Sequence, residues 1–355
     1  MDIKKFFEGF KKQIDRELAV YLDRKIKEIK KLDFFTADLA KQAKKIILSG
    51  GKRLRPAFMY WGYIAGGGKN REKILKTSIS IELIHNFLLM HDDIIDHGKI
   101  RHGVETINAR YAKISRLFFN PESAGHFGNS MALIFGDMLS TMGNQVVFTS
   151  DFPSKLIVKA LNQVQTIVSQ AVTGEIQDVY MDSSGKTSEE AILKMYEYKT
   201  AGYTIEGPLN LGAILAGAEE KIFKTLSAYA LPLGVAFQIQ DDILGIFGSE
   251  KKMGKEIGLD IQEGKKTLML FKAQELGDRE QKTFLKGVLG RKNISRAEIK
   301  KFQEIMIKSG ALRYVQNLIS GLVAEAKESL AQADMEPEAE DFLLSTADYI
   351  AARKK

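Results

Sequence analysis

Apolar and polar residues alternate along this 355-residue chain with the period of an α-helix almost throughout. Apolar side chains recur every three or four positions, the two-residue period of strands is scarce, and only six prolines interrupt the pattern. The pattern therefore predicts a chain of helices joined by short connections. The predicted helices span 2–31, 36–49, 55–66, 70–97, 129–150, 154–182, 187–201, 203–216, 219–247, 265–276, 295–308, 311–332 and 337–352.

The chain carries no sign of a division into separate units. No proline-rich or Ser/Gly-rich linker interrupts it, and no repeat of fixed period is present. We therefore predict one all-α domain over residues 1–355. Residues 111–128 are expected to form a loop or frayed helix, and residues 248–264 a second, glycine-bearing loop.

Two acidic motifs lie about 150 residues apart in these helical segments. The first contains Asp92, Asp93 and Asp96, and the second contains Asp241 and Asp242. Their apolar surroundings make unpaired carboxylates costly to bury. At 3.6 residues per turn, Asp92 and Asp96 share one stripe of the helix and Asp93 flanks it. Clustered carboxylates suit Mg²⁺, which proteins hold through carboxylates together with substrate phosphates. The motifs predict two facing acidic helices that bind a phosphorylated substrate through Mg²⁺.

Composition narrows the possible functions. The absence of cysteine excludes disulfides and thiolate metal sites. The longest apolar runs are too short to span a membrane, so no membrane span is expected. The net charge of +7 is spread among acidic residues without a basic stripe or stacking aromatics, so nucleic-acid binding is not expected. The N-terminal residues form a charged amphipathic pattern without the features of a signal peptide, which predicts a cytoplasmic location.

Basic residues accompany the acidic motifs in glycine-bearing segments. Residues 50–56 read GGKRLRP, in which Lys52, Arg53 and Arg55 lie between two glycines and the start of a helix. A helix N-terminus with adjacent basic side chains suits a diphosphate. Further basic segments contain Lys99, Arg101, His102, Lys199, Lys255, Lys265 and Lys266.

The order of these motifs is similar to that of a known family. GGKRLRP, HDDIIDHGKIRHG, YKT, FQIQDDILGIFG and GLDIQEGKKT follow one another between residues 50 and 267. This order resembles the trans-isoprenyl diphosphate synthases. The resemblance implies an all-α bundle around a deep apolar cavity, usually as a homodimer. It also implies Mg²⁺-dependent head-to-tail condensation of isopentenyl diphosphate with an allylic diphosphate, such as dimethylallyl, geranyl or farnesyl diphosphate.

The resemblance assigns roles to individual residues. Asp92, Asp96 and Asp241 would hold Mg²⁺, three ions per active site, and Asp93 and Asp242 would support them. It implies that Lys52, Arg55 and His85 bind isopentenyl diphosphate. It implies that Arg101, Lys199 and Lys255 bind the allylic diphosphate. Thr200 and Gln238 would line the allylic cation, with Lys265 nearby.

Two positions depart from the family pattern. Gly245 stands where a third aspartate of the second motif is usual, and His102 stands where an arginine is usual. Histidine is a weaker diphosphate ligand than the permanently charged guanidinium. These departures motivate an alternative, a non-catalytic subunit that pairs with an active homologue. A terpene cyclase is disfavoured by the isopentenyl-site residues Lys52, Arg55 and His85. A squalene-type synthase is disfavoured because it needs a reductant and no dinucleotide motif is present.

Product length is expected to depend on residues that precede the first acidic motif. Phe87 and Leu88 lie five and four positions before Asp92, roughly 6–8 Å away along a helix. In the resembling family, bulky side chains here form the floor of the cavity. A lone aromatic residue without an insertion in DDIID resembles archaeal-type geranylgeranyl diphosphate synthases. We therefore predict a twenty-carbon product, with farnesyl and geranylfarnesyl diphosphate as alternatives.

Overall fold

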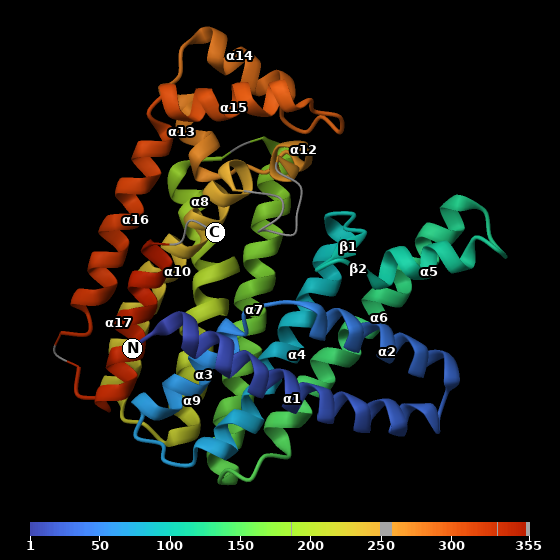
Figure 1. Cartoon of the computed structure of the whole chain (residues 1–355), viewed down its shortest axis with the longest axis vertical. Coiled ribbons are helices and arrows are strands. Elements are labelled where there is room, and N and C mark those ends of the chain that lie inside the picture. Colours follow the sequence, from blue (N-terminus) through green and yellow to red (C-terminus); the bar gives the residue numbers. More distant parts are fainter. Residues whose placement is uncertain (186, 249–257, 332, 353–355) are drawn as a thin grey trace.

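The computed structural model describes residues 1–185, 187–248, 258–331 and 333–352. Within these ranges the chain is a bundle of helices with a single two-stranded hairpin (Figure 1). The predicted all-α class is confirmed. The elements are α1 (Ile3–Lys30), α2 (Phe34–Ser49), α3 (Leu54–Ala65), α4 (Arg71–Ile95), β1 (Ile100–Arg101), β2 (Val104–Glu105), α5 (Ile107–Ser115), α6 (Pro121–Phe148), α7 (Ser154–Ser184), α8 (Glu189–Tyr196), the π-helix η1 (Glu197–Glu206), α9 (Gly207–Ala216), α10 (Glu220–Phe247), α12 (Leu259–Glu263), α13 (Leu268–Leu276), α14 (Arg279–Val288), α15 (Arg296–Lys308), α16 (Ala311–Glu328) and α17 (Pro337–Ala351).

Side-chain caps determine where many of these helices begin. At each cap a side-chain oxygen accepts the backbone N–H three residues further on, which satisfies a donor that has no partner within the helix. The caps of this kind at the starts of α1, α2, α4, α8 and α13 are Asp2, Asp33, Asn70, Ser188 and Thr267.

Helix α10 runs through the bundle and packs against η1, α16 and α17. By length and composition it is apolar enough to cross a membrane, with a mean hydropathy of 1.3. Leu226, Leu233 and Ala236 of this helix are fully buried against neighbouring helices. One helix of this length and composition is weak evidence for a membrane span, because core helices share both properties. The same helix carries the second acidic motif.

Helices from both ends of the chain meet in one aromatic cluster. The Phe342 ring of α17 stacks on Trp61 of α3 with ring centroids 4.9 Å apart, and Phe6 of α1 packs edge-on against Phe342. The N-terminal ammonium also lies 3.0 Å from the Asp341 carboxylate. Helices α1, α3 and α17 thus share one packed core, and the single domain over residues 1–355 stays a prediction.

The prediction of a loop or frayed helix at residues 111–128 is wrong. Most of this segment belongs to α5 and α6, which project beside α2 (Figure 1). The Asn120 side chain caps α6 at 2.9 Å from the Ser123 nitrogen, and Pro121 occupies the first turn. Gly128 lies within α6 and does not break it. Its lack of a side chain lets α6 approach α5 closely. A Cβ atom at Gly128 would lie 2.2 Å from the Asn108 carbonyl oxygen.

The predicted break between helices 187–201 and 203–216 is also absent. The chain passes from α8 through η1 into α9 without a turn. In a π-helix the hydrogen bonds run from residue i to i+5, which alters the residues that share a face. Helix α7 lies close to η1 because Gly174 has no side chain, and a Cβ there would lie 2.4 Å from the Lys199 nitrogen. Thus η1 positions Lys199 and Thr200 beside α7.

Besides α5, three further features of the described chain were not predicted from the sequence. These are the β1–β2 hairpin, the five-residue helix α12 and helix α14. A signal for α14 was present, because Asp278 and Gln281 form a reciprocal capping box at its start. Helix α12 lies within the segment 248–264 that was predicted to be a loop, and residues 249–257 of that segment are outside the described part of the chain.

Candidate active site

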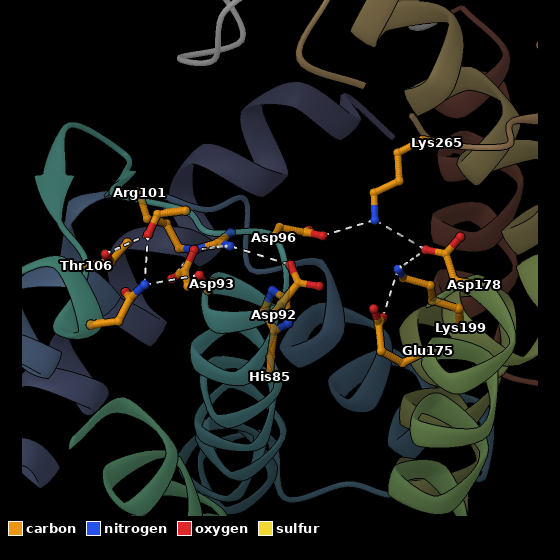
Figure 2. Close-up of polar contacts among 12 residues, drawn as sticks. His85, Asp92, Asp93, Asp96, Arg101, Thr106, Glu175, Asp178, Lys199 and Lys265 are labelled. Carbon is orange, nitrogen blue, oxygen red and sulfur yellow. Dashed lines mark hydrogen bonds and ion pairs between the residues drawn. The ribbon is translucent and has the colours of Figure 1, made fainter. Parts of the chain in front are cut away.

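The first acidic motif lies at the C-terminal end of α4, and its aspartates point in two directions (Figure 2). Asp93 is buried and accepts hydrogen bonds from Arg101 of β1, with Nη2 at 2.8 Å. Asp96 points instead toward Lys265 in the segment before α13 (Figure 2). Asp92 lines the same pocket, and one of its carboxylate oxygens lies 3.6 Å from Arg101 Nη2. The stripe predicted for Asp92 and Asp96, flanked by Asp93, is therefore present.

Two lysines lie opposite this motif. The Lys265 ammonium is 3.0 Å from the Asp96 carboxylate and 3.6 Å from that of Asp178. The Lys199 ammonium is 2.5 Å from Asp178 and 2.8 Å from Glu175 (Figure 2). Burial disfavours the charged form of both lysines, but the surrounding carboxylates raise the pKa of each above its ordinary value. Both lysines are therefore fixed cations between acidic helices.

Glu175 and Asp178 were not identified from the sequence. They belong to α7, and together with Asp182 they follow the i, i+3, i+7 spacing of one helix face. Burial and the nearby Asp178 carboxylate together raise the pKa of Asp182 to about 6. Three acidic residues at this spacing on one face of α7 are the signal that could have located this wall of the site.

The carboxylates of the first motif lie in an environment that favours a cation. Burial raises the pKa of Asp92, and the neighbouring Asp96 carboxylate acts in the same direction. Among the described residues, no three acidic or histidine side chains converge closely enough to hold a metal ion by themselves. Hard divalent cations commonly complete such a partial oxygen shell with substrate phosphates and water. The donor set therefore fits Mg²⁺ bound together with a phosphorylated substrate.

The second acidic motif faces the same space from α10. A pocket of about 200 Å³ is lined by residues of both motifs, including Asp92, Asp96 and Asp242. Asp242 is buried and accepts hydrogen bonds from the Tyr196 hydroxyl and from Gln238 Nε2, the latter at 2.8 Å. Burial raises the pKa of Asp242 to about 8.

The other residues predicted around the second motif have different positions. Thr200 Oγ1 donates a hydrogen bond to Gln238 Oε1 at 2.6 Å, so these two predicted residues lie together. Asp241 is half-buried on α10 and is not among the residues that line the pocket. Lys255 lies outside the described residues.

Arg55 and His85 form a second polar cluster with Tyr203 and Thr204. Arg55 Nη1 lies 3.1 Å from His85 Nε2, and Nη2 donates to Thr204 Oγ1 at 2.7 Å. Because a guanidinium can only donate, His85 Nε2 must accept, and its Nδ1–H then donates to the Tyr203 hydroxyl at 2.7 Å. Burial and the Arg55 charge hold the pKa of His85 well below its ordinary value. The imidazole is therefore neutral and fixed in one tautomer.

The basic segment 50–56 divides into residues with different roles. Arg53 is buried, and its guanidinium lies 2.7 Å from Asp15 and 2.6 Å from Glu82. The interpretation of Arg53 as part of a diphosphate-binding cluster is therefore wrong, because its guanidinium is buried and forms ion pairs with these two carboxylates. Lys52 lies at the surface, with its ammonium 5.7 Å from the centroid of the Tyr349 ring.

The hairpin brings His102 to this basic segment. His102 lies at the turn between β1 and β2 with a φ of 51°. Its ring packs on Gly50, where a Cβ atom would lie only 2.3 Å from the ring Cγ. His102 and the turn that contains Lys52 are therefore neighbours, although they are about 50 residues apart in the sequence.

An apolar cavity of about 320 Å³ extends between α4, α7 and η1. It is lined by Leu88 and Leu89 from α4 and by Ala171 and Val172 from α7, among others. Phe87 is not a lining residue. Its ring packs edge-on against His91 with centroids 4.8 Å apart, and the His91 ring does line the cavity.

Comparison with known proteins places these features in a family. Residues 36–306 match the family described as polyprenyl synthetase. A geranylgeranyl pyrophosphate synthase of Geoglobus acetivorans is 32% identical over 341 residues, which cover 96% of this chain and 98% of the relative. A geranylfarnesyl diphosphate synthase of Aeropyrum pernix is 29% identical over 315 residues, which cover 87% of this chain and 92% of the relative.

A solved structure matches almost the entire chain. The crystal structure of a geranylgeranyl pyrophosphate synthase from Corynebacterium glutamicum, complexed with isoprenyl diphosphate and magnesium, has a TM-score of 0.92 at 29% identity. The match covers 99% of this chain and 100% of the other. The sequence-based assignment is confirmed, and the chain belongs to the polyprenyl synthetase family.

Proposed function

We propose that this protein is a short-chain trans-prenyltransferase that condenses isopentenyl diphosphate with an allylic diphosphate in a head-to-tail (1′-4) reaction. The observation that carries the proposal is the single pocket where the two acidic motifs face each other with Lys199 and Lys265 on its wall. Family membership and the cavity that opens beside Asp92 support the same assignment.

The acidic side of the pocket is the proposed site of the allylic diphosphate. Asp92 and Asp96 of α4 and Asp241 of α10 would hold Mg²⁺, with Asp93 and Asp242 as supporting residues. We propose three ions per active site. Bound Mg²⁺ neutralises the charge that develops on the departing diphosphate. Asp93 fixes the position of Arg101 through their bidentate contact, and the same guanidinium lies 3.6 Å from Asp92.

Lysine side chains supply the remaining positive charge on that side. Lys199 and Lys265 are held between carboxylates, so their ammonium groups are positioned before substrate binds. Positive groups arranged in advance around a leaving diphosphate stabilise it without reorganisation during the reaction. The resemblance adds Arg101 and Lys255 to this set.

Isopentenyl diphosphate is proposed to bind on the opposite side, near the basic turn. Arg55 and His85 are linked there by a direct contact, and Lys52 and His102 belong to segments that touch each other. The neutral His85 would act as a hydrogen-bonding group and not as a charge. Arg53 has no part in this site, because it pairs with Asp15 and Glu82.

The proposed reaction needs no nucleophilic side chain. The bond between C1 of the allylic substrate and its diphosphate oxygen breaks, and the double bond of isopentenyl diphosphate attacks the allylic carbon. Loss of a proton to the released diphosphate then forms an allylic product five carbons longer. Thr200 and Gln238 are proposed to line the cation, and the apolar cavity keeps water from it.

A twenty-carbon product is proposed, in agreement with the prediction from residues Phe87 and Leu88. Leu88 lines the cavity directly, and Phe87 supports it from behind through His91. Farnesyl and geranylfarnesyl diphosphate remain the alternatives.

A homodimer and a cytoplasmic location are also proposed. Helices α6 and α7 carry large apolar side chains that are exposed in the single chain, among them Ile134 and Phe148 on α6 and Val158 and Tyr180 on α7. Large exposed apolar side chains on two neighbouring helices favour a protein interface. A second copy of the chain is the partner that we propose for this face.

The experiment that tests the proposed function is a release assay. Purified protein is incubated with Mg²⁺, isopentenyl diphosphate and, in turn, dimethylallyl, geranyl and farnesyl diphosphate, and released diphosphate is measured. We expect release that requires both substrates and stops when EDTA is added. Absence of release with all three starters would favour the alternative, a non-catalytic subunit of a heteromeric synthase.

A further inference from the structure

Tyr196 is the last residue of α8 and lies between the second acidic motif and the segment that carries Lys265. It is buried, and it lines the pocket of about 200 Å³ together with Asp242 and Lys265. Its hydroxyl contacts two separate parts of the chain. It donates a hydrogen bond to Asp242 Oδ2 and accepts one from the backbone N–H of Leu268 at 3.0 Å. No step of the proposed reaction uses this tyrosine.

The direction of each hydrogen bond follows from the groups involved. A backbone N–H can only donate, so the Leu268 contact occupies a lone pair of the Tyr196 oxygen and leaves the hydroxyl proton for Asp242. At the other carboxylate oxygen Gln238 Nε2 donates at 2.8 Å, and the Gln238 Oε1 accepts from Thr200. Asp242 is therefore held at both oxygens by neutral side chains in the wall of the pocket.

The same hydroxyl fixes the start of α13. Leu268 is the first residue of this helix, so its N–H has no acceptor within the helix, and Tyr196 supplies one from α8. Lys265 lies three positions earlier in the sequence, and the N–H of Lys266 donates to Asp182 Oδ1 at 3.1 Å. The segment that presents the Lys265 ammonium is thus bonded to α7 at one point and to α8 at another.

We propose that Tyr196 is a positioning residue that couples the second acidic motif to the segment of Lys265. This inference rests on the proposed function. One hydroxyl holds both a carboxylate that supports the Mg²⁺ site and the amide that begins α13, so a shift of either group weakens the hydrogen bond of the other. Groups around a metal site orient its direct ligands, and their loss commonly weakens metal binding about 10–100-fold. Tyr196 thereby keeps Asp242 and Lys265 in a fixed relation around the bound diphosphate.

The first measurement that tests this role needs no metal ion. Hydrogen–deuterium exchange in EDTA is followed by mass spectrometry at the Leu268 amide in the wild type and in Tyr196→Phe. Phenylalanine keeps the ring and removes only the hydroxyl, so we expect exchange about 10-fold faster, the scale of one hydrogen bond. Tyr229→Phe is the matched control, since Tyr229 is a buried tyrosine whose hydroxyl donates to the Leu343 carbonyl at 2.7 Å. Unchanged Leu268 exchange in Tyr196→Phe would overturn the inference.

The second measurement separates positioning of the site from a general loss of stability. Mn²⁺ binding in the presence of inorganic diphosphate is followed by electron paramagnetic resonance. We expect Tyr196→Phe to bind Mn²⁺ about 10-fold more weakly and Tyr229→Phe to bind it as the wild type does, although each variant loses a buried hydroxyl. Wild-type affinity in Tyr196→Phe, or equal weakening in both variants, would contradict the proposal. Failure of the wild type to bind Mn²⁺ with diphosphate would instead overturn the proposed function itself, so the two failures are distinguishable.

Discussion

The Lys265 ammonium lies 3.0 Å from the Asp96 carboxylate, which joins the segment before α13 to the end of α4 across 169 residues of sequence. The same ammonium is 3.6 Å from Asp178 of α7. One lysine thus links three separate parts of the pocket wall. It offsets the repulsion between carboxylates that would otherwise be brought together without a cation.

This relationship predicts a loss of stability in Lys265→Met when no divalent ion is present. The substitution keeps most of the side-chain volume and leaves Asp96 and Asp178 without a charged partner. We expect the free energy of unfolding to fall by about 2 kcal/mol in EDTA, the scale of a hydrogen bond to a charged group. Urea unfolding measures the change. Lys44→Met is the control, because the Lys44–Asp23 pair lies largely at the surface and should contribute about 0–1 kcal/mol. Equal effects in both variants would contradict this role for Lys265.

His85 predicts a pH dependence of stability with a definite sign. In the folded protein its pKa is depressed by burial and by Arg55, whereas in the unfolded chain it takes up a proton below about pH 6.5. The unfolded state therefore binds more protons, and stability rises with pH through this range. The His85 contribution is fully present above about pH 6.5 and is lost below it, by up to about 1.4 kcal/mol per pH unit.

The matched variant is His85→Gln, which cannot titrate. Between pH 7 and pH 5, the urea midpoint of the wild type should fall further than that of His85→Gln. Parallel midpoint curves for the two proteins would show that His85 is not a buried neutral group. The comparison needs no activity, so it tests the Arg55–His85–Tyr203 geometry independently of the proposed reaction.

The product is predicted to become longer when side chains at the wall of the apolar cavity are shortened. Leu88→Ala removes a side chain that lines the cavity, and Phe87→Ala removes the ring on which His91 packs. Both variants should form longer products than the wild-type twenty-carbon compound. Chromatography of the dephosphorylated products measures this. A wild-type product that ends at fifteen carbons, or unchanged length in both variants, would refute the assignment.

The proposed homodimer predicts that charge on α6 separates the subunits. Ile134 and Phe148 are 58% and 68% exposed in the single chain. Placing aspartates at both positions would bury two unpaired carboxylates in the interface. We expect light scattering to report a dimer for the wild type and a monomer for Ile134→Asp/Phe148→Asp. Val20→Asp, a change at an exposed apolar residue of α1, should leave the dimer intact. A monomeric wild type would refute this arrangement.

The parts of the site that depend on helical periodicity could be predicted from the sequence. The period of 3.6 residues alone places Asp92 and Asp96 on one stripe, and both residues lie on the same side of the end of α4 in the structure. The fold class follows from the same periodicity. The segment 111–128 was misread because the residues from Asn120 to Gly125 are typical of a turn, whereas in the structure Asn120 caps α6 and Pro121 occupies its first turn.

The parts of the site that depend on tertiary packing could not be predicted in this way. Glu175 and Asp178 resemble a solvated helix face until η1 brings Lys199 against them. Arg53 has a left-handed backbone with a φ of 57°, and local sequence does not predict that this turns its side chain into the fold. Asp260 likewise lines the acidic pocket from α12, and its carboxylate lies against Gly245 of α10.

The most direct measurement of the central claim follows bond formation in the wild type, Asp92→Ala and Asp241→Ala. Each protein is incubated with Mg²⁺, farnesyl diphosphate and radiolabelled isopentenyl diphosphate, and the labelled products are separated by chromatography. The wild type should place the label in a twenty-carbon allylic product. Both variants should lose about 10²–10³-fold in rate with an unchanged circular dichroism spectrum, because each removes stabilisation of the leaving diphosphate. Near-wild-type rates in both variants, or no elongated product from the wild type, would contradict the account.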